Sequence, residues 1–201
     1  MKLIDKLLFG LLLGFSFPAL FFLIALILWY SLFQDFNVLS FVLSGFIIGL
    51  FIDALILKKL INRTLDLSTW ILTGFYLFYN VCIYGAFMGF PVFNLVMGII
   101  AGYYFGIKIN NRNISLKKVE ALKKNVPLFS GLTMLLFCIS TGFLALTEKT
   151  IGEELQEMFG LGFDVTRNMI IAIVIVGGIA LIFTQFYLTR IVMIKTIRKN
   201  N

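Results

Sequence analysis

The segment from Leu67 to Ile107 carries no charged residue and is far longer than one membrane crossing. A helix needs about 20 apolar residues to cross a hydrocarbon layer of ~30 Å. At about 1.5 Å per residue, this segment would reach roughly 60 Å as a single helix. It must therefore fold back on itself, and we expect the turn at Gly89-Phe90-Pro91, where glycine and proline interrupt one helix and proline suits the start of the next.

Further apolar runs of membrane-spanning length lie on both sides of this segment. Together they predict an all-α integral membrane protein, a bundle of six transmembrane helices in one domain, 1–201. The composition agrees, because 60% of the residues are hydrophobic and only 13% are charged, whereas a soluble domain carries about 25% charged residues. This excludes a soluble globular enzyme, a disordered chain and a secreted disulfide scaffold. The predicted spans are 7–33, 38–57, 67–89, 91–107, 127–147 and 168–194.

Basic residues predict the orientation of these spans. All but two of the 17 lysine and arginine residues fall at the two chain ends or in the loops after the second and fourth predicted spans, and six crossings place these positions on one side. Cytoplasmic loops are enriched in lysine and arginine. We therefore expect a multi-pass protein of the cell membrane with both termini in the cytoplasm. The same bias explains the net charge of +7, so no nucleic-acid partner is expected.

Two loops are predicted to hold short interfacial helices. In the loop 108–126, Ser115 can cap a basic amphipathic helix. We expect this helix to lie on the anionic inner leaflet of the bilayer, or to bind a cytoplasmic protein partner. After the fifth span, Thr150 and Glu153 match a capping box and predict a short acidic helix that ends at Gly160.

Glycines at four-residue spacing recur along the predicted spans. Apolar side chains gain nothing by leaving lipid for one another, so close backbone approach through small residues is what favours helix association. The spacing therefore predicts a tightly packed bundle. The glycines expected at helix contacts are Gly10, Gly14, Gly45, Gly49, Gly85, Gly89, Gly98, Gly102 and Gly106.

A polar stripe follows the third predicted span, where Tyr76, Asn80 and Tyr84 recur at four-residue steps. Asn94, near the start of the fourth span, shares the register of Gly98. We interpret Tyr76, Asn80, Tyr84 and Asn94 as a substrate-binding site for a small neutral or aromatic solute. The alternative is a structural role, because hydrogen bonds between membrane helices are common. The last two spans add Ser130, Thr133, Ser140, Thr141, Thr184 and Gln185.

Asp53 is the only acidic residue well within a predicted span. A charge at the centre of a bilayer costs about 2.5–3.5 kcal/mol or more, so such a residue normally has a partner or a function. Arg190 is expected at a similar depth on the last span. We hypothesise an Asp53–Arg190 ion pair between the second and sixth helices, with proton or ion coupling as the alternative.

No catalytic constellation is present. Histidine, the commonest general base and metal ligand, is absent, and Cys82 and Cys138 both lie in apolar runs. We therefore expect no enzyme activity, no metal and no cofactor. The preferred function is a small-solute transporter or a solute-binding membrane subunit. A non-catalytic accessory or assembly subunit of a membrane complex is the alternative, and an intramembrane lipid-modifying enzyme is the third possibility.

Overall fold

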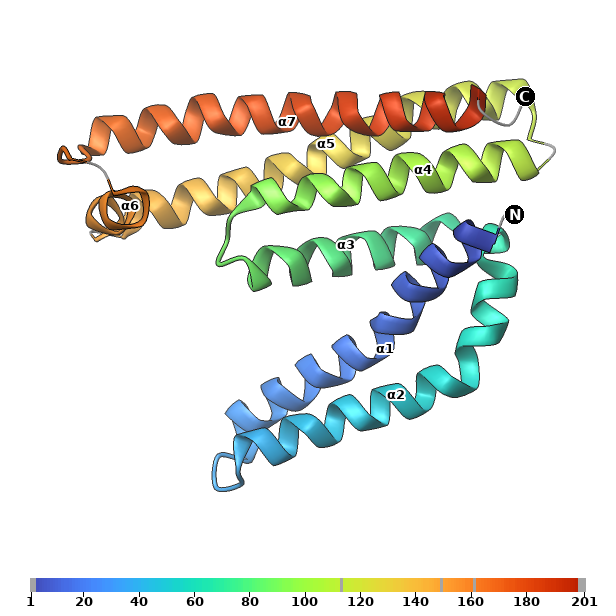
Figure 1. The fold of residues 1–201 in the computed structure, drawn as a ribbon, viewed down its shortest axis with the longest axis horizontal. Coiled ribbons are helices and arrows are strands. Elements are labelled where there is room, and N and C mark those ends of the chain that lie inside the picture. Colours follow the sequence, from blue (N-terminus) through green and yellow to red (C-terminus); the bar gives the residue numbers. More distant parts are fainter. Residues whose placement is uncertain (1–2, 113, 149, 161, 199–201) are drawn as a thin grey trace. The chain divides into compact units, whose positions relative to one another are not determined.

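The computed structural model describes residues 3–112, 114–148, 150–160 and 162–198, and all regular structure within these ranges is helical (Figure 1). The chain divides into two compact units, Met1–Phe75 and Tyr76–Asn201, which are described separately. In chain order the elements are α1 (Leu3–Leu32), α2 (Val38–Arg63), η1 (Thr64–Asp66), α3 (Thr69–Ala86), η2 (Pro91–Asn94), α4 (Leu95–Asn111), α5 (Leu116–Thr147), α6 (Ile151–Phe159) and α7 (Arg167–Arg198).

Five helical segments among the described residues are long and apolar enough to cross a membrane. This is the pattern of a multi-pass membrane protein. The helix α3 is not one of them: it has 18 residues, and the polar side chains of its stripe lower its hydropathy. The five segments are Leu12–Leu32, Val38–Asp66, Pro91–Asn111, Leu116–Thr147 and Arg167–Ile197.

In the first unit, α1 and α2 form a helical hairpin, and local hydrogen bonds bridge the connection between them (Figure 1). The indole Nε1 of Trp29 donates to the backbone oxygen of Phe36 at 2.8 Å. Asn37 caps α2, because its side-chain oxygen accepts from the backbone N–H of Ser40 at 3.2 Å. The turn therefore holds the two helices antiparallel.

The two helices of this hairpin meet at Gly45 and Gly49 of α2. A Cβ atom on Gly45 would lie 2.5 Å from the Cβ of Ala25, and one on Gly49 would lie 2.6 Å from the Cα of Pro18. Such distances are shorter than real carbon–carbon contacts. The backbones of α1 and α2 thus approach so closely that only glycine fits at these two positions.

Two glycines of α1 face side chains of α2 rather than its backbone. A Cβ on Gly10 would lie 3.1 Å from the Cδ1 of Ile61, and one on Gly14 would lie 3.2 Å from the Oδ2 of Asp53. These contacts are tight, but the atoms opposite are the far ends of side chains. The packing at Gly10 and Gly14 is therefore more adaptable than the packing at Gly45 and Gly49.

In the second unit, α4 and α5 both pack against α7, and Figure 1 shows these three long helices side by side. The contact between α4 and α7 runs along Gly98, Gly102 and Gly106. A Cβ on Gly106 would lie 2.6 Å from the Cβ of Thr196, and one on Gly102 would collide with the backbone oxygen of Thr189. Glycines therefore set the separation of α4 and α7.

The part of α3 that belongs to the second unit contacts α5 through large aromatic side chains. The Tyr76 ring lies 5.6 Å from that of Phe129, and the Tyr84 ring lies 4.8 Å from that of Phe137. Aromatic rings at such distances attract one another beyond their buried area. The tyrosines of the polar stripe are thus also the packing residues of α3.

The remaining glycines of the predicted seam, Gly85 and Gly89, have other settings. A Cβ on Gly85 would meet nothing within 4 Å. The third span was expected to extend to Gly89, but α3 ends at Ala86. Met88 and Gly89 have φ angles of 53° and 81°, and the left-handed backbone at these two residues turns the chain toward η2.

The separate interfacial helix expected in the loop 108–126 is wrong. The helix α5 runs without interruption from Leu116 to Thr147 and includes Pro127. Residues 116–126 contain good helix formers and no glycine. A proline removes only one backbone hydrogen bond, and the helix continues through it. The basic segment is therefore the first part of α5.

The acidic helix expected after the fifth span is confirmed as α6, and it ends at Gly160 with a φ of 60°. The predicted capping box is wrong. Thr150 lies at the N-cap position of α6 with helical backbone angles, and its side chain makes no capping hydrogen bond. Its hydroxyl instead donates to the Oε1 of Glu154 at 2.9 Å. The glycine signal at the end of this helix was thus more informative than the signal at its start.

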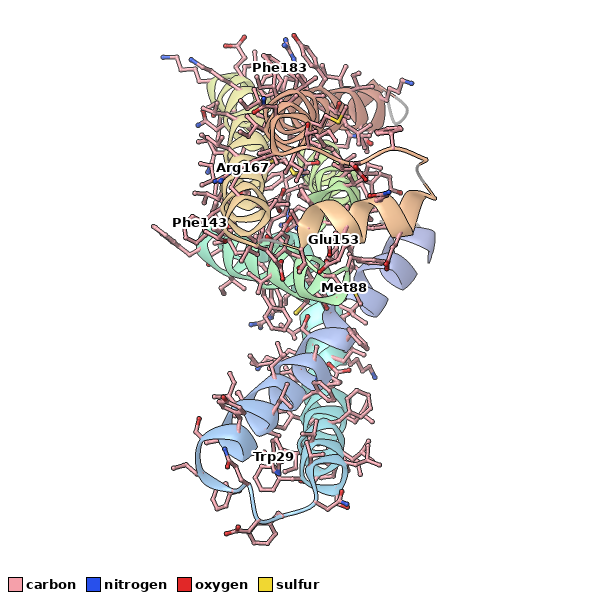
Figure 2. The ribbon with its side chains drawn as sticks, turned by 90° about the vertical axis from the view of Figure 1, so that its left-hand side faces the viewer. Trp29, Met88, Phe143, Glu153, Arg167 and Phe183 are labelled. Atoms are coloured by element: carbon pink, nitrogen blue, oxygen red, sulfur yellow. The ribbon has the colours of Figure 1, made fainter. Side chains whose placement is uncertain are left out.

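Large apolar side chains cover the outside of the second unit. Phe143 of α5 is 66% exposed and Phe183 of α7 is 59% exposed, and Figure 2 labels both of them on this unit. Exposed phenylalanines along whole helices are unfavourable in water and favourable in a hydrocarbon layer. This surface is consistent with a bilayer environment.

Candidate functional site: a buried polar cluster

The interior of the second unit contains a group of neutral polar side chains, which we call the polar cluster. Its members come from α3, η2, α5 and α7, and each is buried. Tyr76 is the most exposed, at 9%, and Thr189 the least, at 0%. The polar cluster comprises Tyr76, Asn80, Asn94, Ser130, Gln185 and Thr189.

Ser130 of α5 lies at the centre of the hydroxyl part of this cluster. Its Oγ is 2.8 Å from the hydroxyl of Tyr76, 2.9 Å from the Nε2 of Gln185 and 3.1 Å from the Oγ1 of Thr189. The Nε2 of Gln185 also donates to the Tyr76 hydroxyl at 3.2 Å. Three side chains from α3 and α7 therefore converge on one serine oxygen of α5.

Gly98 of α4 gives the α7 side of this arrangement its space. A Cβ on Gly98 would lie 2.7 Å from both the Nε2 of Gln185 and the Oγ1 of Thr189. Gln185 and Thr189 are four residues apart and so lie on the same face of α7. The glycine seam between α4 and α7 therefore also places two polar side chains inside the unit.

The two asparagines form the second part of the polar cluster. The Nδ2 of Asn80 donates to the backbone oxygen of Tyr76 at 2.8 Å. The Nδ2 of Asn94 donates to both the backbone oxygen and the Oδ1 of Asn80, each at 2.9 Å. A contact of 3.5 Å from the Nε2 of Gln185 to the backbone oxygen of Asn94 joins the two parts.

Two carbonyl oxygens of the cluster accept no hydrogen bond from any residue that the structure describes. They are the Oδ1 of Asn94 and the Oε1 of Gln185, and both are buried. A buried acceptor without a donor costs about 1–3 kcal/mol. Atoms of this kind mark a place where something other than the described side chains provides a donor.

Tyr84, the remaining residue of the predicted site, lies outside the polar cluster. Its hydroxyl is 3.1 Å from the Oγ1 of Thr141, and Thr141 donates to the backbone oxygen of Gly89 at 2.7 Å. This group joins α3, α5 and the turn after α3. The structure thus brings Tyr76, Asn80 and Asn94 together and assigns Tyr84 to a separate contact.

Asp53 and Arg190 belong to different units. Asp53 is a buried residue of α2, and its Oδ1 has no hydrogen-bond donor among the described residues. Arg190 lies on α7, with its side chain exposed. The relative placement of the two units is not determined, so the ion pair between these residues stays a prediction.

A concave pocket lies away from the polar cluster, where α5 ends and α7 begins. It has a volume of about 430 Å³, and its lining includes the charged residues Glu148 and Arg167 as well as apolar residues such as Leu146 and Ile170. Among the described residues, no group of three or more histidine, cysteine, aspartate or glutamate side chains is arranged to hold a metal ion. The two cysteines are free thiols.

No protein-family model, curated protein or solved structure matches this chain. The fold and the polar cluster therefore define it only by class, as a multi-pass helical membrane protein. Its function must be argued from the chemistry of the cluster.

Sequence reasoning identified most of the polar cluster but missed Thr189. A signal for it was available, because Thr189 follows Gln185 by four residues and so shares its helical face. The convergence of α5 and α7 on α3 had no such signal. Periodicity predicts which side chains share one face of a helix. It does not predict which other helix packs against that face.

Proposed function

We propose that this chain is a membrane protein that binds a small solute within the bilayer, either as a transporter or as the solute-binding subunit of one. The polar cluster is the proposed site. The observation that carries the proposal is the convergence of six buried polar side chains from α3, η2, α5 and α7.

The number and chemistry of these groups support a binding role over simple helix adhesion. Hydrogen bonds between membrane helices contribute only about 0.6 kcal/mol on average, so helix adhesion alone gives little reason to bury six polar side chains together. The cluster also retains two acceptors, on Asn94 and Gln185, without a donor among the described residues. Convergent neutral polar groups inside an apolar shell are typical of small-molecule sites.

The proposal includes six crossings, with both termini in the cytoplasm. We assign the sixth crossing to α3, whose mean hydropathy is lowered by the tyrosines and asparagine that it turns toward α5 and η2. A membrane helix that contributes polar residues to an internal site is expected to score lower than one that faces only lipid. The distribution of lysine and arginine supports this orientation.

The test is a screen of small neutral solutes for their effect on the thermal unfolding of the purified protein. A ligand that binds the folded state raises the unfolding temperature. We expect the gain to be lost in Ser130→Ala, which removes the central hydroxyl of the cluster. The matched control is Ser140→Ala on the same helix, where the exposed hydroxyl bonds only to Leu136. If no solute stabilises the wild type more than Ser130→Ala, the proposal is wrong.

A second candidate function is that of an accessory or assembly subunit that binds a cytoplasmic protein. The first turns of α5 favour it, because Leu116 is 83% exposed beside the exposed Lys117 and Lys118. An apolar side chain among lysines suits an acidic protein surface or an anionic membrane. Co-purification of a stoichiometric partner that is lost in Leu116→Glu, without any stabilising solute, would favour this function.

A further inference from the structure

We propose that the solute bound by the polar cluster is a small neutral molecule that donates at least two hydrogen bonds, one to the Oδ1 of Asn94 and one to the Oε1 of Gln185. Primary amides and short polyols are the chemical classes with this property. The inference rests on the proposed function and specifies its ligand.

The hydrogen bonds of the Asn94 side chain determine the orientation of its amide. Oxygen and nitrogen of an amide are assigned from their hydrogen-bond partners. The Nδ2 of Asn94 is 2.9 Å from two acceptors, the backbone oxygen and the Oδ1 of Asn80. The Asn80 amide is itself fixed, because its Nδ2 donates to the backbone oxygen of Tyr76. Nitrogen is therefore on the Asn80 side, and the Asn94 oxygen is the group without a donor.

The contacts of the Gln185 side chain determine the orientation of its amide in the same way. Its Nε2 faces the backbone oxygen of Asn94, which can only accept, as well as the hydroxyls of Tyr76 and Ser130. An oxygen at that place would meet the carbonyl lone pairs of Asn94. The Oε1 is thus the second acceptor without a donor, and it belongs to a residue in direct contact with the first.

The hydrogen-bond donors of the polar cluster can be counted from its contacts. Each hydroxyl carries one proton. The Tyr76 hydroxyl contacts Ser130 at 2.8 Å, and the Ser130 hydroxyl contacts Thr189 at 3.1 Å. The Thr189 hydroxyl donates to the backbone oxygen of Gln185 at 2.8 Å, so these three hydroxyl protons have acceptors within the cluster. The amide nitrogens of Asn80, Asn94 and Gln185 donate to acceptors other than the Asn94 Oδ1 and the Gln185 Oε1. No donor of the cluster therefore reaches either of these two oxygens, so a ligand must bring its own donors.

The polar cluster also limits the charge and the size of the solute. All six members of the polar cluster are neutral, so a charged solute would lose its hydration without gaining a counter-ion. The seam side of the cluster is filled, since even a Cβ on Gly98 would lie 2.7 Å from the Gln185 amide. A small neutral solute fits these limits better than the aromatic one that the tyrosines had suggested.

The test uses acetamide and its methylated analogue N,N-dimethylacetamide, which keeps the carbonyl group but has no N–H donor. The chain has three glutamines, Gln34, Gln156 and Gln185. Glutamine labelled with ¹³C at the side-chain carbonyl, in a protein with Gln34→Glu and Gln156→Glu, isolates the Gln185 stretch in difference infrared spectra. No residue of the cluster is altered.

We expect acetamide to shift the Gln185 carbonyl stretch to lower frequency in a saturable manner, and N,N-dimethylacetamide to leave it unchanged. An equal shift with both amides would overturn the inference while leaving solute binding intact. A stretch that is already hydrogen-bonded and unresponsive would mean that ordered water alone fills the place, which also overturns it. The proposed function fails separately, if no solute gives a Ser130-dependent stabilisation.

Ethylene glycol and its dimethyl ether extend the same comparison to polyols. We expect the glycol to raise the unfolding temperature of the wild type and the diether to have no effect. Gln185→Met keeps an unbranched side chain of similar length but lacks the carbonyl oxygen, and we expect it to abolish the glycol effect. Persistence of that effect in a folded Gln185→Met protein would contradict the assignment of this acceptor.

Discussion

Gly102 of α4 lies directly against the backbone of Thr189 in α7, with no room for a Cβ between them. The atom opposite is a backbone oxygen, which cannot rotate away as a side chain can. The adjacent Gly98 faces the side chains of Gln185 and Thr189. One helix contact thus sets both the separation of α4 and α7 and the place of two polar-cluster residues.

Gly102→Ala should therefore destabilise the protein. The added methyl group forces the two backbones apart, and such overpacking costs about 1–3 kcal/mol. The measurement is the midpoint of thermal or denaturant unfolding in detergent. Gly85→Ala is the matched control on α3, where a Cβ meets nothing within 4 Å, and there alanine should be neutral or should stabilise by up to about 1 kcal/mol. Equal effects at both positions would contradict the close approach of α4 to α7.

A second comparison tests the α1–α2 hairpin in the same way. Gly49→Ala places a methyl group against the backbone of Pro18, whereas Gly10→Ala meets only the flexible end of Ile61, at 3.1 Å. We expect a loss of about 1–3 kcal/mol for Gly49→Ala and less than about 1 kcal/mol for Gly10→Ala. Unfolding of the two variants in parallel measures the difference. A larger loss for Gly10→Ala would show that the hairpin packs differently.

Thr141→Val should loosen the turn that follows α3. The Thr141 hydroxyl contacts Tyr84 and donates to the backbone oxygen of Gly89, so its loss leaves two polar groups without this partner, at about 1–3 kcal/mol. Thr133→Val is the control on the same helix. The Thr133 hydroxyl bonds only to Phe129 of its own helix, whose carbonyl keeps its helical partner, and the expected loss is below about 1 kcal/mol. Hydrogen exchange at residues 87–90 should rise only in Thr141→Val.

The sequence predicted the helical class and the approximate limits of the helices, because long uncharged runs leave few alternatives. It also predicted the end of α6, since Gly160 takes a left-handed conformation that glycine adopts freely. It failed where two signals competed. The predicted fifth span begins at Pro127, but good helix formers precede this proline and α5 continues through it.

The candidate site was less predictable, because it depends on which helices meet. The register of Tyr76 and Asn80 could be derived from spacing, and both lie in the polar cluster. Tyr84 has the same register, yet one turn further along α3 its neighbour on α5 is Thr141 rather than Ser130. The spacing of residues within α3 does not show which side chains of α5 lie opposite each turn.

The hypothesis of an Asp53–Arg190 pair predicts non-additive effects in a double-mutant cycle. We expect Asp53→Asn and Arg190→Gln each to lower the free energy of unfolding. The loss in the double variant should be smaller than the sum of the two single losses by about 0.5–3 kcal/mol. The unfolding free energies of the four proteins give this coupling. Strict additivity would remove the pair and leave Asp53, whose Oδ1 has no described donor, as a candidate for proton or ion coupling.

The crossing of α3 decides the topology, and it can be tested by cysteine accessibility. With α3 as a sixth crossing, the chain ends lie on the same side of the membrane, whereas the five candidate spans alone would place them on opposite sides.

Cys82→Ala and Cys138→Ala remove the native thiols. Single cysteines then replace the exposed residues Lys6, Asp35 and Lys195. In oriented vesicles, an impermeant maleimide should label positions 6 and 195 from the same side and position 35 from the other. Labelling of 6 and 195 from opposite sides would show that α3 does not cross, and the assignment of six crossings would then be wrong.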